Sequence, residues 1–545
     1  MSSLGHQLAT SVLVVGNGAA GLRAAIEVAE AGVAVVAVAH RSGDGVPAAA
    51  EVGGSETVPA VTGPGGTWER HMADTLRASH ELADPRTAQI VARAAAHDAG
   101  RYGMRLDRPY DGRDIGLDVR RALRRRARQL AVPVLSGVYV TRLLVDDGTV
   151  FGAYGFDLVD GSRCLVHADS VILATGGHTR IWRRAAARRH ENTGSSFRLA
   201  VEAGARLRDP ELVQFHPFGL ITPDHAAGTL VSETAHGAGG VLLNNLGERF
   251  MARYHAEPSE LSGRDRVALA SYTEIKEGRG TPSGGVWLDL SHLPPETVLA
   301  RLPQVHRTLL ERQMLDITRD PIEVVPTAQV SLGGVRVRPE DHSTDVEGLF
   351  VVGEAASGLH GANRLEGNSL IELLVYGRIT GQAAAEYSAA LTGPRRSPAA
   401  IRAAESDVQR LLTADGDQNV RALQRSVRRL MTEHAGVVRD EAGLVAGLAA
   451  LDEIEARMAD VGVHVDIGGF QDLAHAYDLR SGVLAARATL ECALERRETR
   501  GCHHRSDHPG ADPDLRVSLV WSPTTGVRRE PVPPVPTDIA ALLHE

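Results

Sequence analysis

The stretch SVLVVGNGAAGLRAAIEVAEAGVAVVAVAH, residues 11–40, combines a strand, a glycine turn, a helix and a second strand. The apolar run before the glycines is typical of a buried strand, and the alanine-rich run after them has the period of a helix. Gly16, Gly18 and Gly21 give the turn the spacing GxGxxG. Glycines there permit a tight turn and let backbone amides approach a pyrophosphate at the helix N-terminus. The stretch therefore predicts a dinucleotide-binding unit of the Rossmann type.

Three further features indicate which dinucleotide binds. The second strand ends at His40, without the acidic residue that binds the ribose of NAD. The stretch ILATGG (172–177) predicts another strand end and glycine turn, with Gly176 in the turn. The stretch GLFVVGEA (348–355) places Glu354 where the ribitol of a flavin needs a hydroxyl acceptor. Each stretch alone is also compatible with an ordinary buried strand, but the three in this order favour FAD over NAD.

The composition is that of a globular chain with more than one domain. It has 545 residues, of which 43% are apolar and 23% charged, so two or three domains are expected. A net charge of -9 argues against a nucleic-acid or anionic-membrane binder. One basic run, VRRALRRRARQL (119–130), is the exception. We interpret it as a solvated helix that is anchored inward by Leu123 and Leu130.

Cysteine usage and hydropathy bear on partners and location. Cys164, Cys492 and Cys502 form neither a disulfide framework nor a CxxC pair, so a metal cluster would have to come from another subunit. No segment reaches the roughly eighteen apolar residues of a membrane span, and the start of the chain lacks a basic region before a hydrophobic core. These features predict a soluble, cytoplasmic chain with no metal site of its own.

Longer motifs carry a resemblance to a known family. They are QFHPFG (214–219), LVSETAHGAGG (230–240), GERFMARY (247–254), LSGRD (261–265), EIKEGRG (274–280), PTAQVSLGG (326–334), GLHGANRLEGNSLIELLVYGR (358–378) and RRETRGCHHRSDHP (496–509). With these motifs the chain resembles the flavoprotein family of succinate dehydrogenase, fumarate reductase and L-aspartate oxidase, which are FAD-dependent oxidoreductases of type 2. The resemblance extends from about residue 10 to residue 515.

The resemblance implies an α/β architecture in three parts. A Rossmann-like FAD-binding domain is expected at residues 1–217 and 329–395, with an inserted α+β capping domain at 218–328. A C-terminal helical domain with a Pro-rich tail is expected at 399–545, where the arginines and histidines of the last motif would support the cleft by ion pairing. No histidine is placed for a covalent flavin link, so the FAD is expected to be noncovalent.

The resemblance also implies the residues of the site. Hydride transfer from a dicarboxylate needs both carboxylates held, an acid or base for the proton, and the exclusion of water. Substrate binding falls to His216, Ser232, Gln329 and Arg364, proton transfer to Arg264 with Glu233 and His236 as its relay, and further cofactor contacts to Asn368 and Ser369.

Four departures from the family pattern concern the substrate end and the flavin loop. Gln329 stands where the family has a histidine, so it can donate a hydrogen bond but brings no charge. Phe218 replaces a small hydroxyl residue and adds bulk beside the pocket. The stretch AAAEVGGSE (48–56) only loosely resembles the flavin-side loop of the family. The segment at 105–118 is short and lacks the loop that contacts the substrate amine in aspartate oxidases. We expect a retained redox core with an altered substrate end.

The leading functional hypothesis is an FAD-dependent oxidoreductase that transfers a hydride between a small dicarboxylate, of the succinate or fumarate kind, and noncovalent FAD. An L-aspartate oxidase is the alternative within the family. A non-catalytic flavin-binding subunit of a redox complex is the alternative from another class. The expected partners are a small carboxylate substrate and an iron–sulfur or other electron-transfer subunit.

Overall fold

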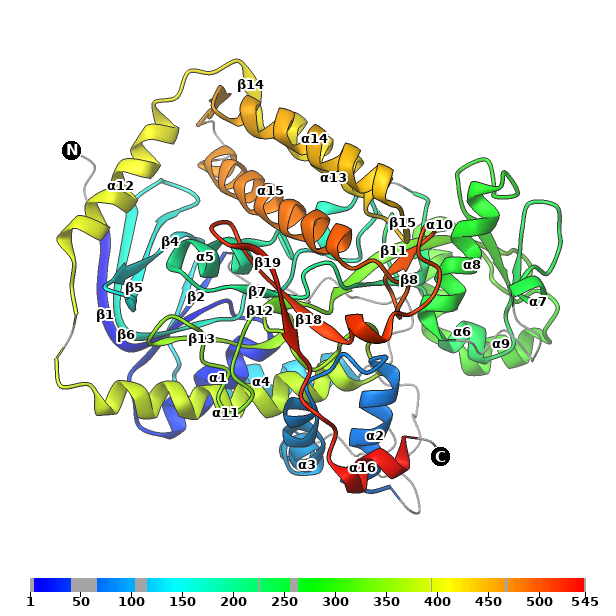
Figure 1. Ribbon diagram of the computed structural model, residues 1–545, viewed down its shortest axis with the longest axis horizontal. Helices are drawn as coiled ribbons and strands as arrows, with labels where there is room; N and C mark the ends of the chain where they lie inside the picture. The colour runs from blue at the N-terminus through cyan, green and yellow to red at the C-terminus, as the bar shows by residue number, and fades with distance from the viewer. Residues whose placement is uncertain are drawn as a thin grey trace.

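The glycine turn follows the first strand of the main sheet in the computed structural model of the chain (Figure 1). The structure describes residues 4–40, 66–102, 115–223, 226–254, 263–393, 395–465 and 469–543. Within these residues the main sheet has the strand order β3 (Val134–Ser136), β2 (Val35–Ala39), β1 (Leu4–Val15), β6 (Arg163–Leu173), β5 (Thr149–Asp157) and β4 (Val138–Asp146), and β13 (Leu349–Val351) pairs with β6.

The parallel part of this sheet brings the predicted cofactor motifs to one edge. Strands β3, β2, β1, β6 and β13 are parallel, whereas β5 and β4 continue the sheet as an antiparallel hairpin. Val15 pairs with Leu173, and Leu173 pairs with Val351, so these three strands end side by side. Ligands of such sheets bind outside the carboxyl ends of the strands. The predicted α/β fold class is confirmed.

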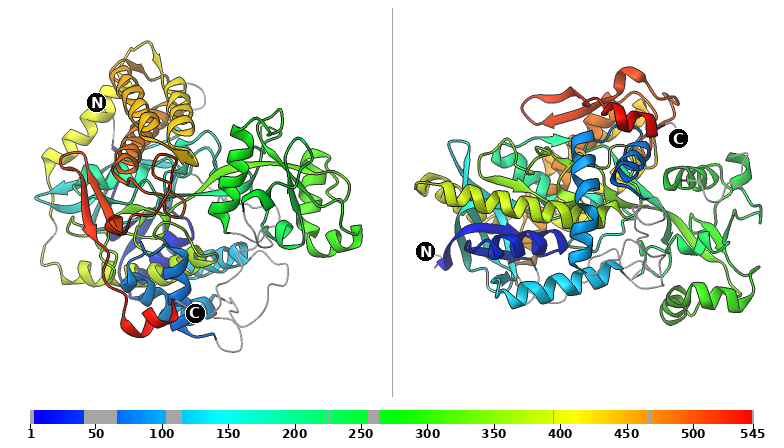
Figure 2. Two further views of the ribbon diagram at one scale, coloured as in Figure 1. Left: turned by 45° about the vertical axis from the view of Figure 1, so that its right-hand side comes forward. Right: turned by 90° about the horizontal axis from the view of Figure 1, so that it is seen from below.

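Helices cover the sheet, and two of them pack against each other directly below it (Figures 1 and 2). These are α1 (Ala19–Glu30) and α11 (Asn368–Ala390), which share one apolar core with β1. A Cβ atom at Gly381 would lie 2.6 Å from the backbone oxygen of Ala24, so glycine permits this close contact. The remaining helices of this part are α2 (Trp68–Ala78), α3 (Pro85–Arg101), α4 (Ile115–Gln129) and α5 (Ser195–Ala203).

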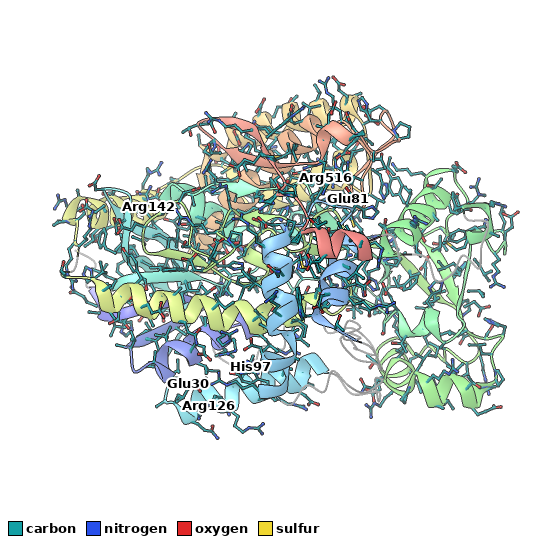
Figure 3. The ribbon with its side chains drawn as sticks, turned by 60° about the horizontal axis from the view of Figure 1, so that its bottom comes forward. Glu30, Glu81, His97, Arg126, Arg142 and Arg516 are labelled. Carbon is teal, nitrogen blue, oxygen red and sulfur yellow. The ribbon has the colours of Figure 1, made fainter. Side chains whose placement is uncertain are left out.

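The predicted basic helix is α4, and it is fastened to α1. Leu123 is fully buried, as expected, and Leu130 is partly buried against the same core. Arg126 forms an ion pair of 2.8 Å with Glu30 at the end of α1 (Figure 3). The helix is therefore anchored to α1 and its core by apolar contacts and by this ion pair.

An inserted lobe, which we define as residues 218–324, projects from the main body (Figures 1 and 2). In its sheet the order is β8 (Val213–Leu220), β11 (Ile322–Ser331), β10 (Val286–Asp289) and β9 (Val241–Leu243). Its described helices are α6 (Thr234–Gly237), α7 (Met251–Tyr254), α8 (Arg264–Lys276), α9 (Pro295–Arg301) and α10 (Pro303–Gln313).

Strands β8 and β11 run through both parts of the molecule. On β8, Phe215 packs in the core of the main body, whereas Phe218 packs in the core of the lobe. On β11, Val324 belongs to the lobe core and Ala328 to the core of the main body. The division of the chain into domains at 217/218 and 328/329 remains a prediction.

The C-terminal region starts with helices and ends with a hairpin. Its helices are α12 (Pro398–Leu412), α13 (Val420–His434), α14 (Glu441–Met458), α15 (Gln471–Glu495) and α16 (Thr537–Leu542). Strands β18 (Val517–Ser522) and β19 (Gly526–Pro531) form a hairpin that joins β7 (Leu207–Arg208) and β12 (Gly334–Val335) in one sheet. Residues 518–522 of β18 are all buried, because the strand lies between β7 and β19 and packs on the body. The short elements are η1 (Thr179–Ile181), η3 (Gly353–Ala355), η4 (Pro513–Leu515), β14 (Gln418–Asn419), β15 (Val438–Arg439), β16 (Val461–Gly462) and β17 (His504–Arg505).

The last sequence motif forms buried ion pairs, as expected. Arg496 is fully buried and contacts Asp209 at 3.1 Å, Glu211 at 2.7 Å and Glu498 at 3.2 Å. A further pair, Arg516 with Glu81, fixes the segment before β18 on the outside of the molecule (Figure 3). Breaking one of the buried pairs of Arg496 would leave a charge without compensation, which costs about 3–5 kcal/mol.

Among the described residues, no helix is both long and apolar enough to cross a membrane.

Candidate active site

The glycine turn has the geometry that a phosphate-binding loop requires. Gly16 has a φ of +112°, and a Cβ atom there would lie 2.2 Å from the backbone oxygen of Ala174. Gly18 directly precedes α1, and a Cβ atom there would meet nothing within 4 Å. No side chain caps the N-terminus of α1, so its first amides are available to an anion.

A cavity of about 1030 Å³ extends from this turn to the root of the inserted lobe. Gly16, Gly18 and Gly176 line it together with Glu354 and Ser369. Gln329 and Arg364, predicted to bind substrate, line the same cavity. A volume at the upper end of the usual range for ligand pockets suits a dinucleotide, and the open space above Gly18 suits a pyrophosphate. The residues present fit FAD.

Glu354 is held as a hydrogen-bond acceptor in the cavity wall. Its Oε1 atom accepts hydrogen bonds from Asn192 Nδ2 at 2.8 Å and from the backbone amide of Ser331 at 2.9 Å. Burial raises the pKa of Glu354, whereas these two hydrogen bonds oppose the rise. Asn192 was not predicted from the sequence, because no pattern around it signals a partner for residue 354.

The two predicted cofactor residues at the start of α11 have different surroundings. Asn368 Oδ1 accepts a hydrogen bond from His71 Nε2 at 2.8 Å, and Asn368 Nδ2 donates to Thr75 Oγ1 at 2.9 Å. Both partners are on α2, and Asn368 does not belong to the cavity lining, whereas Ser369 does. The amide of Asn368 therefore fastens α11 to α2 in this structure.

Three predicted site residues meet at one carboxylate oxygen. Glu233 Oε1 accepts a hydrogen bond from Arg264 Nε at 2.5 Å and lies 3.5 Å from His216 Nε2. Although burial acts to raise the pKa of Glu233, the charge and the hydrogen bond of Arg264 lower it, so the carboxylate is charged. Arg264 starts α8, and its Nη2 atom also lies 3.4 Å from Glu366, which sequence reasoning did not single out.

His216 is a neutral hydrogen-bond donor. Its Nδ1 atom accepts a hydrogen bond from the backbone amide of Phe218 at 3.1 Å, which leaves the proton on Nε2. Burial lowers the pKa of His216 to about 3, and Arg264 and Arg364 act in the same direction. The Nε2–H group faces Glu233 Oε1 at 3.5 Å and is able to donate a hydrogen bond to a carboxylate.

Phe218 lies between His216, which is predicted to bind substrate, and His236, which is predicted to relay protons. Its ring centroid is 5.6 Å from that of His216 and 5.4 Å from that of His236. Phe218 packs in the lobe core and does not line the large cavity, so its bulk separates the two histidines. Ser232, also buried, shares a hydrogen bond of 2.8 Å with Thr234 at the start of α6.

Arg364 and Gln329 form the part of the site that adjoins the cavity. Arg364 Nε donates to Gln214 Oε1 at 3.2 Å, and Gln214 Nε2 donates to Asn363 at 2.7 Å. Gln329 lies at a bulge of β11, and its buried Oε1 atom has no hydrogen-bond partner among the described residues. Gln214 is a positioning residue that the motif QFHPFG contained but that its sequence alone did not identify.

A second pair in the cavity wall was also missed. His360 Nε2 lies 3.0 Å from Glu372 Oε2, both side chains are buried, and both line the cavity. Both residues belong to the long motif at 358–378, but nothing in their spacing indicated a contact.

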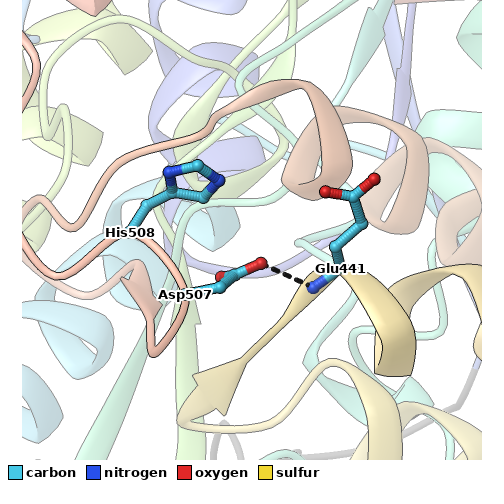
Figure 4. A group of neighbouring side chains, drawn as sticks. All are labelled: Glu441, Asp507 and His508. Carbon is cyan, nitrogen blue, oxygen red and sulfur yellow. Dashed lines mark hydrogen bonds between the residues drawn. The ribbon is translucent and has the colours of Figure 1, made fainter.

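One cluster of described side chains has ligand atoms close enough for a metal ion, on the C-terminal surface (Figure 4). It consists of Glu441, Asp507 and His508. Asp507 already accepts hydrogen bonds from Arg505 at 2.8 Å and 2.7 Å and from the backbone amide of Glu441 at 2.9 Å. Because this carboxylate is compensated without an ion, we assign no metal there.

The glycine turn, the cavity and the arginine–carboxylate cluster define a flavin-dependent oxidoreductase. The chain belongs to the flavoprotein family of succinate dehydrogenase and fumarate reductase, FAD-dependent oxidoreductases that act on CH–CH bonds. Residues 11–370 match the model of the FAD binding domain, and residues 424–533 match that of the fumarate reductase flavoprotein C-terminal region. FAD is the cofactor of this chain.

Individual relatives agree over almost the whole chain. One subunit of the CoM/CoB fumarate reductase of Methanothermobacter marburgensis is 35% identical, with 93% of this chain and 96% of the relative covered. The succinate dehydrogenase flavoprotein subunit of Rickettsia bellii is 32% identical, with 94% and 95% covered. The solved structure of FrdA from E. coli quinol fumarate reductase superposes with a TM-score of 0.89 at 28% identity, covering 98% of each chain.

Proposed function

We propose that this protein oxidises or reduces the central carbon–carbon bond of a small dicarboxylate of the succinate or fumarate kind. The observation that carries the proposal is the convergence of Arg264 and His216 on Glu233 Oε1. In this proposal Arg264 is the proton donor, Glu233 its carboxylate partner and His216 a carboxylate-binding group, and all three lie at the root of the inserted lobe. When bound, FAD supplies the hydride-transfer chemistry.

Arg364 binds one substrate carboxylate in this proposal. Its guanidinium presents donors in a planar fork that matches a carboxylate, and Gln214 fixes the orientation of that fork through Nε. Gln329 lies at the same end of the cavity and adds one neutral hydrogen bond from its amide. This end of the site therefore holds a carboxylate with one full positive charge.

His216 and Ser232 bind the other carboxylate. The neutral imidazole of His216 donates from Nε2, and the hydroxyl of Ser232 donates once it turns away from Thr234. Both side chains are buried, so they act where water does not compete with the substrate. Binding at two ends fixes the carbon–carbon bond in one orientation.

Arg264 delivers or accepts the proton, with Glu233 and His236 as the route onward. A guanidinium with a pKa above about 12 is a weak acid, so it works only with a strongly coupled partner. The charged carboxylate of Glu233, at 2.5 Å, is such a partner. The imidazole of His236 can accept and release a proton, although the Phe218 ring separates it from His216.

L-Aspartate is the second candidate substrate, and one atom favours it. The buried Oε1 atom of Gln329 has no partner among the described residues and can accept a hydrogen bond from an ammonium group. The segment at 105–118 is predicted to lack the loop that contacts the substrate amine in aspartate oxidases. Most of this segment lies outside the described residues. Turnover of L-aspartate to an imine would distinguish this candidate.

We further propose noncovalent FAD and an electron-transfer partner. The flavin-side stretch at 48–56 lies outside the described residues, so the noncovalent link rests on the sequence alone. Relatives from Methanothermobacter marburgensis and Rickettsia bellii are named as subunits, which supports a partner that carries electrons onward. A flavin-binding subunit without turnover of its own is the alternative from another class.

The test is anaerobic mixing of the FAD-loaded protein with succinate or L-aspartate while the flavin absorbance is followed. Bleaching by succinate, and reoxidation of the reduced protein by fumarate, is the expected result. Bleaching by L-aspartate alone would replace the dicarboxylate proposal with the oxidase. Arg264→Gln should abolish bleaching, whereas Arg266→Gln, which changes an exposed arginine of the same helix, should not. Absence of bleaching by every dicarboxylate would favour the non-catalytic subunit.

A further inference from the structure

The basic helix α4, interpreted from its sequence as a solvated surface, turns out to border the cofactor cavity. Arg120 and Arg124 line that cavity, together with Gly116 from the same helix. We propose that Arg120 and Arg124 form a second arm of the FAD site and hold the anionic adenylate half of the dinucleotide. The inference rests on FAD as the cofactor and is independent of the identity of the substrate.

The helix places its side chains on distinct faces. Leu123 and Ala127 are buried toward α1 and its core. Arg120 and Arg124 are four residues apart, so they project from the same face, and both are only partly exposed. Arg121 and Arg125 are exposed on another face of the same helix. The two arginines at the cavity therefore differ from their neighbours by position, not by chemistry.

The topology places these arginines at the edge of the sheet that holds the glycine turn. Helix α4 leads into β3, and β3 pairs in parallel with β2. A helix that precedes a parallel strand runs opposite to it, so its first turns lie at the carboxyl edge of the sheet. Gly116 and Arg120 are in these first turns, at the same edge as Gly16.

Two other residues of the lining mark the adenosine end of the cavity. His40 at the end of β2 and Tyr139 in β4 both line it, and their rings contact each other with centroids 5.5 Å apart. In dinucleotide-binding folds the end of the second strand is where the adenosine ribose lies. Gln329 and Arg364 line the cavity from the root of the lobe and mark its substrate side.

The charges at this end suit an anion. The pyrophosphate of FAD carries negative charge, and arginine forks bind phosphate oxygens in pairs. An acidic side chain at the end of β2 would neutralise the positive charge of Arg120 and Arg124, but the residue there is His40. The helix N-terminus of α1 contributes only partial charge and no basic side chain in its first turn. Arg120 and Arg124 from α4 supply the full positive charges that the glycine turn before α1 lacks.

The test compares two double variants of the same helix that remove the same charge. Arg120→Gln with Arg124→Gln is the test variant, and Arg121→Gln with Arg125→Gln is the control. FAD is titrated into each apoprotein, and binding is followed by quenching of the flavin fluorescence. The test variant should bind FAD about tenfold to a hundredfold more weakly, because hydrogen bonds to charged groups are lost. The control should bind FAD as the wild type does.

Two fragments of the cofactor locate the effect. ADP, which represents the adenylate half, should lose affinity for the test variant in the same way as FAD. Riboflavin, which has no phosphate, should bind all three proteins equally. Equal FAD affinity in the test and control variants would overturn the proposal, and so would an equal loss for riboflavin. If the double variant does not fold, Arg124→Lys and Arg124→Gln serve instead, and only the lysine variant should retain most of the affinity.

Discussion

Glu233 Oε1 accepts a hydrogen bond from Arg264 Nε at 2.5 Å, and this contact joins the loop before α6 to the first turn of α8. Both residues belong to the inserted lobe, so the proton-transfer pair is assembled within one packing unit. The guanidinium group of Arg364, by contrast, belongs to the main body. The proposed substrate site therefore draws on both parts, and the proposed acid–base pair lies in the lobe, with one further contact from Arg264 to Glu366 of the main body.

Replacing Glu233 by glutamine should separate proton transfer from binding. The amide keeps the shape and a hydrogen bond, but it cannot stabilise the charge on Arg264 or pass a proton on. Turnover should fall by about 10²–10⁴-fold, the usual contribution of a positioned acid or base. The dissociation constant for the dicarboxylate, measured from the perturbed flavin spectrum, should change little. Glu296→Gln, an exposed position in the same lobe, is the control. Equal turnover in the two variants would remove Glu233 from the relay.

Buried neutral histidines should make the stability depend on pH. Burial lowers the pKa of His178 and of His216 to about 3, from about 6.5 in an unfolded chain. Between these values the unfolded chain binds more protons than the folded one, so stability rises with pH and is lost as the pH falls below about 6.5. Each group contributes a slope of up to about 1.4 kcal/mol per pH unit. Urea unfolding of His178→Gln should show a shallower slope than the wild type in this window, and an unchanged slope would contradict the assignment.

Two glycines of the cofactor turn should respond differently to alanine. Gly16→Ala places a Cβ atom 2.2 Å from a backbone oxygen at a φ of +112°, so it should lower the free energy of unfolding of the apoprotein by at least about 2 kcal/mol. Gly18→Ala meets nothing within 4 Å and should leave the unfolding of the apoprotein unchanged. Its methyl group projects into the open space, so FAD affinity should fall. Thermal unfolding and FAD titration measured together separate the two effects.

Gln329 should affect substrate affinity more than chemistry. Gln329→Leu removes one hydrogen bond to the substrate, which corresponds to a KM about fivefold to tenfold higher at nearly constant kcat. Gln329→His should restore a donor, and binding should strengthen as the pH falls, because the protonated ring adds a charge. Steady-state kinetics over a range of pH would show this. A large fall in kcat for the leucine variant would instead place Gln329 in the proton-transfer step.

Local sequence was enough to predict the elements that repeat a fixed geometry. The glycine turn needs small residues at set spacing, and the buried strands before Gly16, Gly176 and Glu354 are short apolar runs. Their convergence follows from the parallel order of β1, β6 and β13. The meeting of Glu233 with Arg264 was expected from the resemblance to a family, since 31 positions separate them in the sequence.

Contacts between distant segments escaped prediction. Glu354 is held by Asn192, 162 positions away, and Arg364 by Gln214, 150 positions away. Asn192 has no sequence pattern of its own, and the motif that contains Gln214 does not indicate its contact with Arg364. The basic run of α4 has the composition of a solvated helix, and only its position beside α1 brings Arg120 and Arg124 to the cavity. The hairpin β18–β19 was not predicted, because the prolines at this end of the chain indicate a tail rather than a pair of strands.

The inserted lobe is attached to the main body by two paired strands rather than by loops alone. His216 on β8 lies opposite Thr327 on β11, and the ladder is irregular on both sides of this pair, between Val325 and Thr327 and between Ala328 and Val330. A swing of the lobe would have to flex this ribbon, and a ribbon bends most easily at its bulges. His216 and Gln329 lie at or beside these bulges, where the ribbon bends. A swing of the lobe about these bulges would change the distance between Arg264 in the lobe and Arg364 in the main body, so a stiffer ribbon would hold these two side chains at a more constant separation.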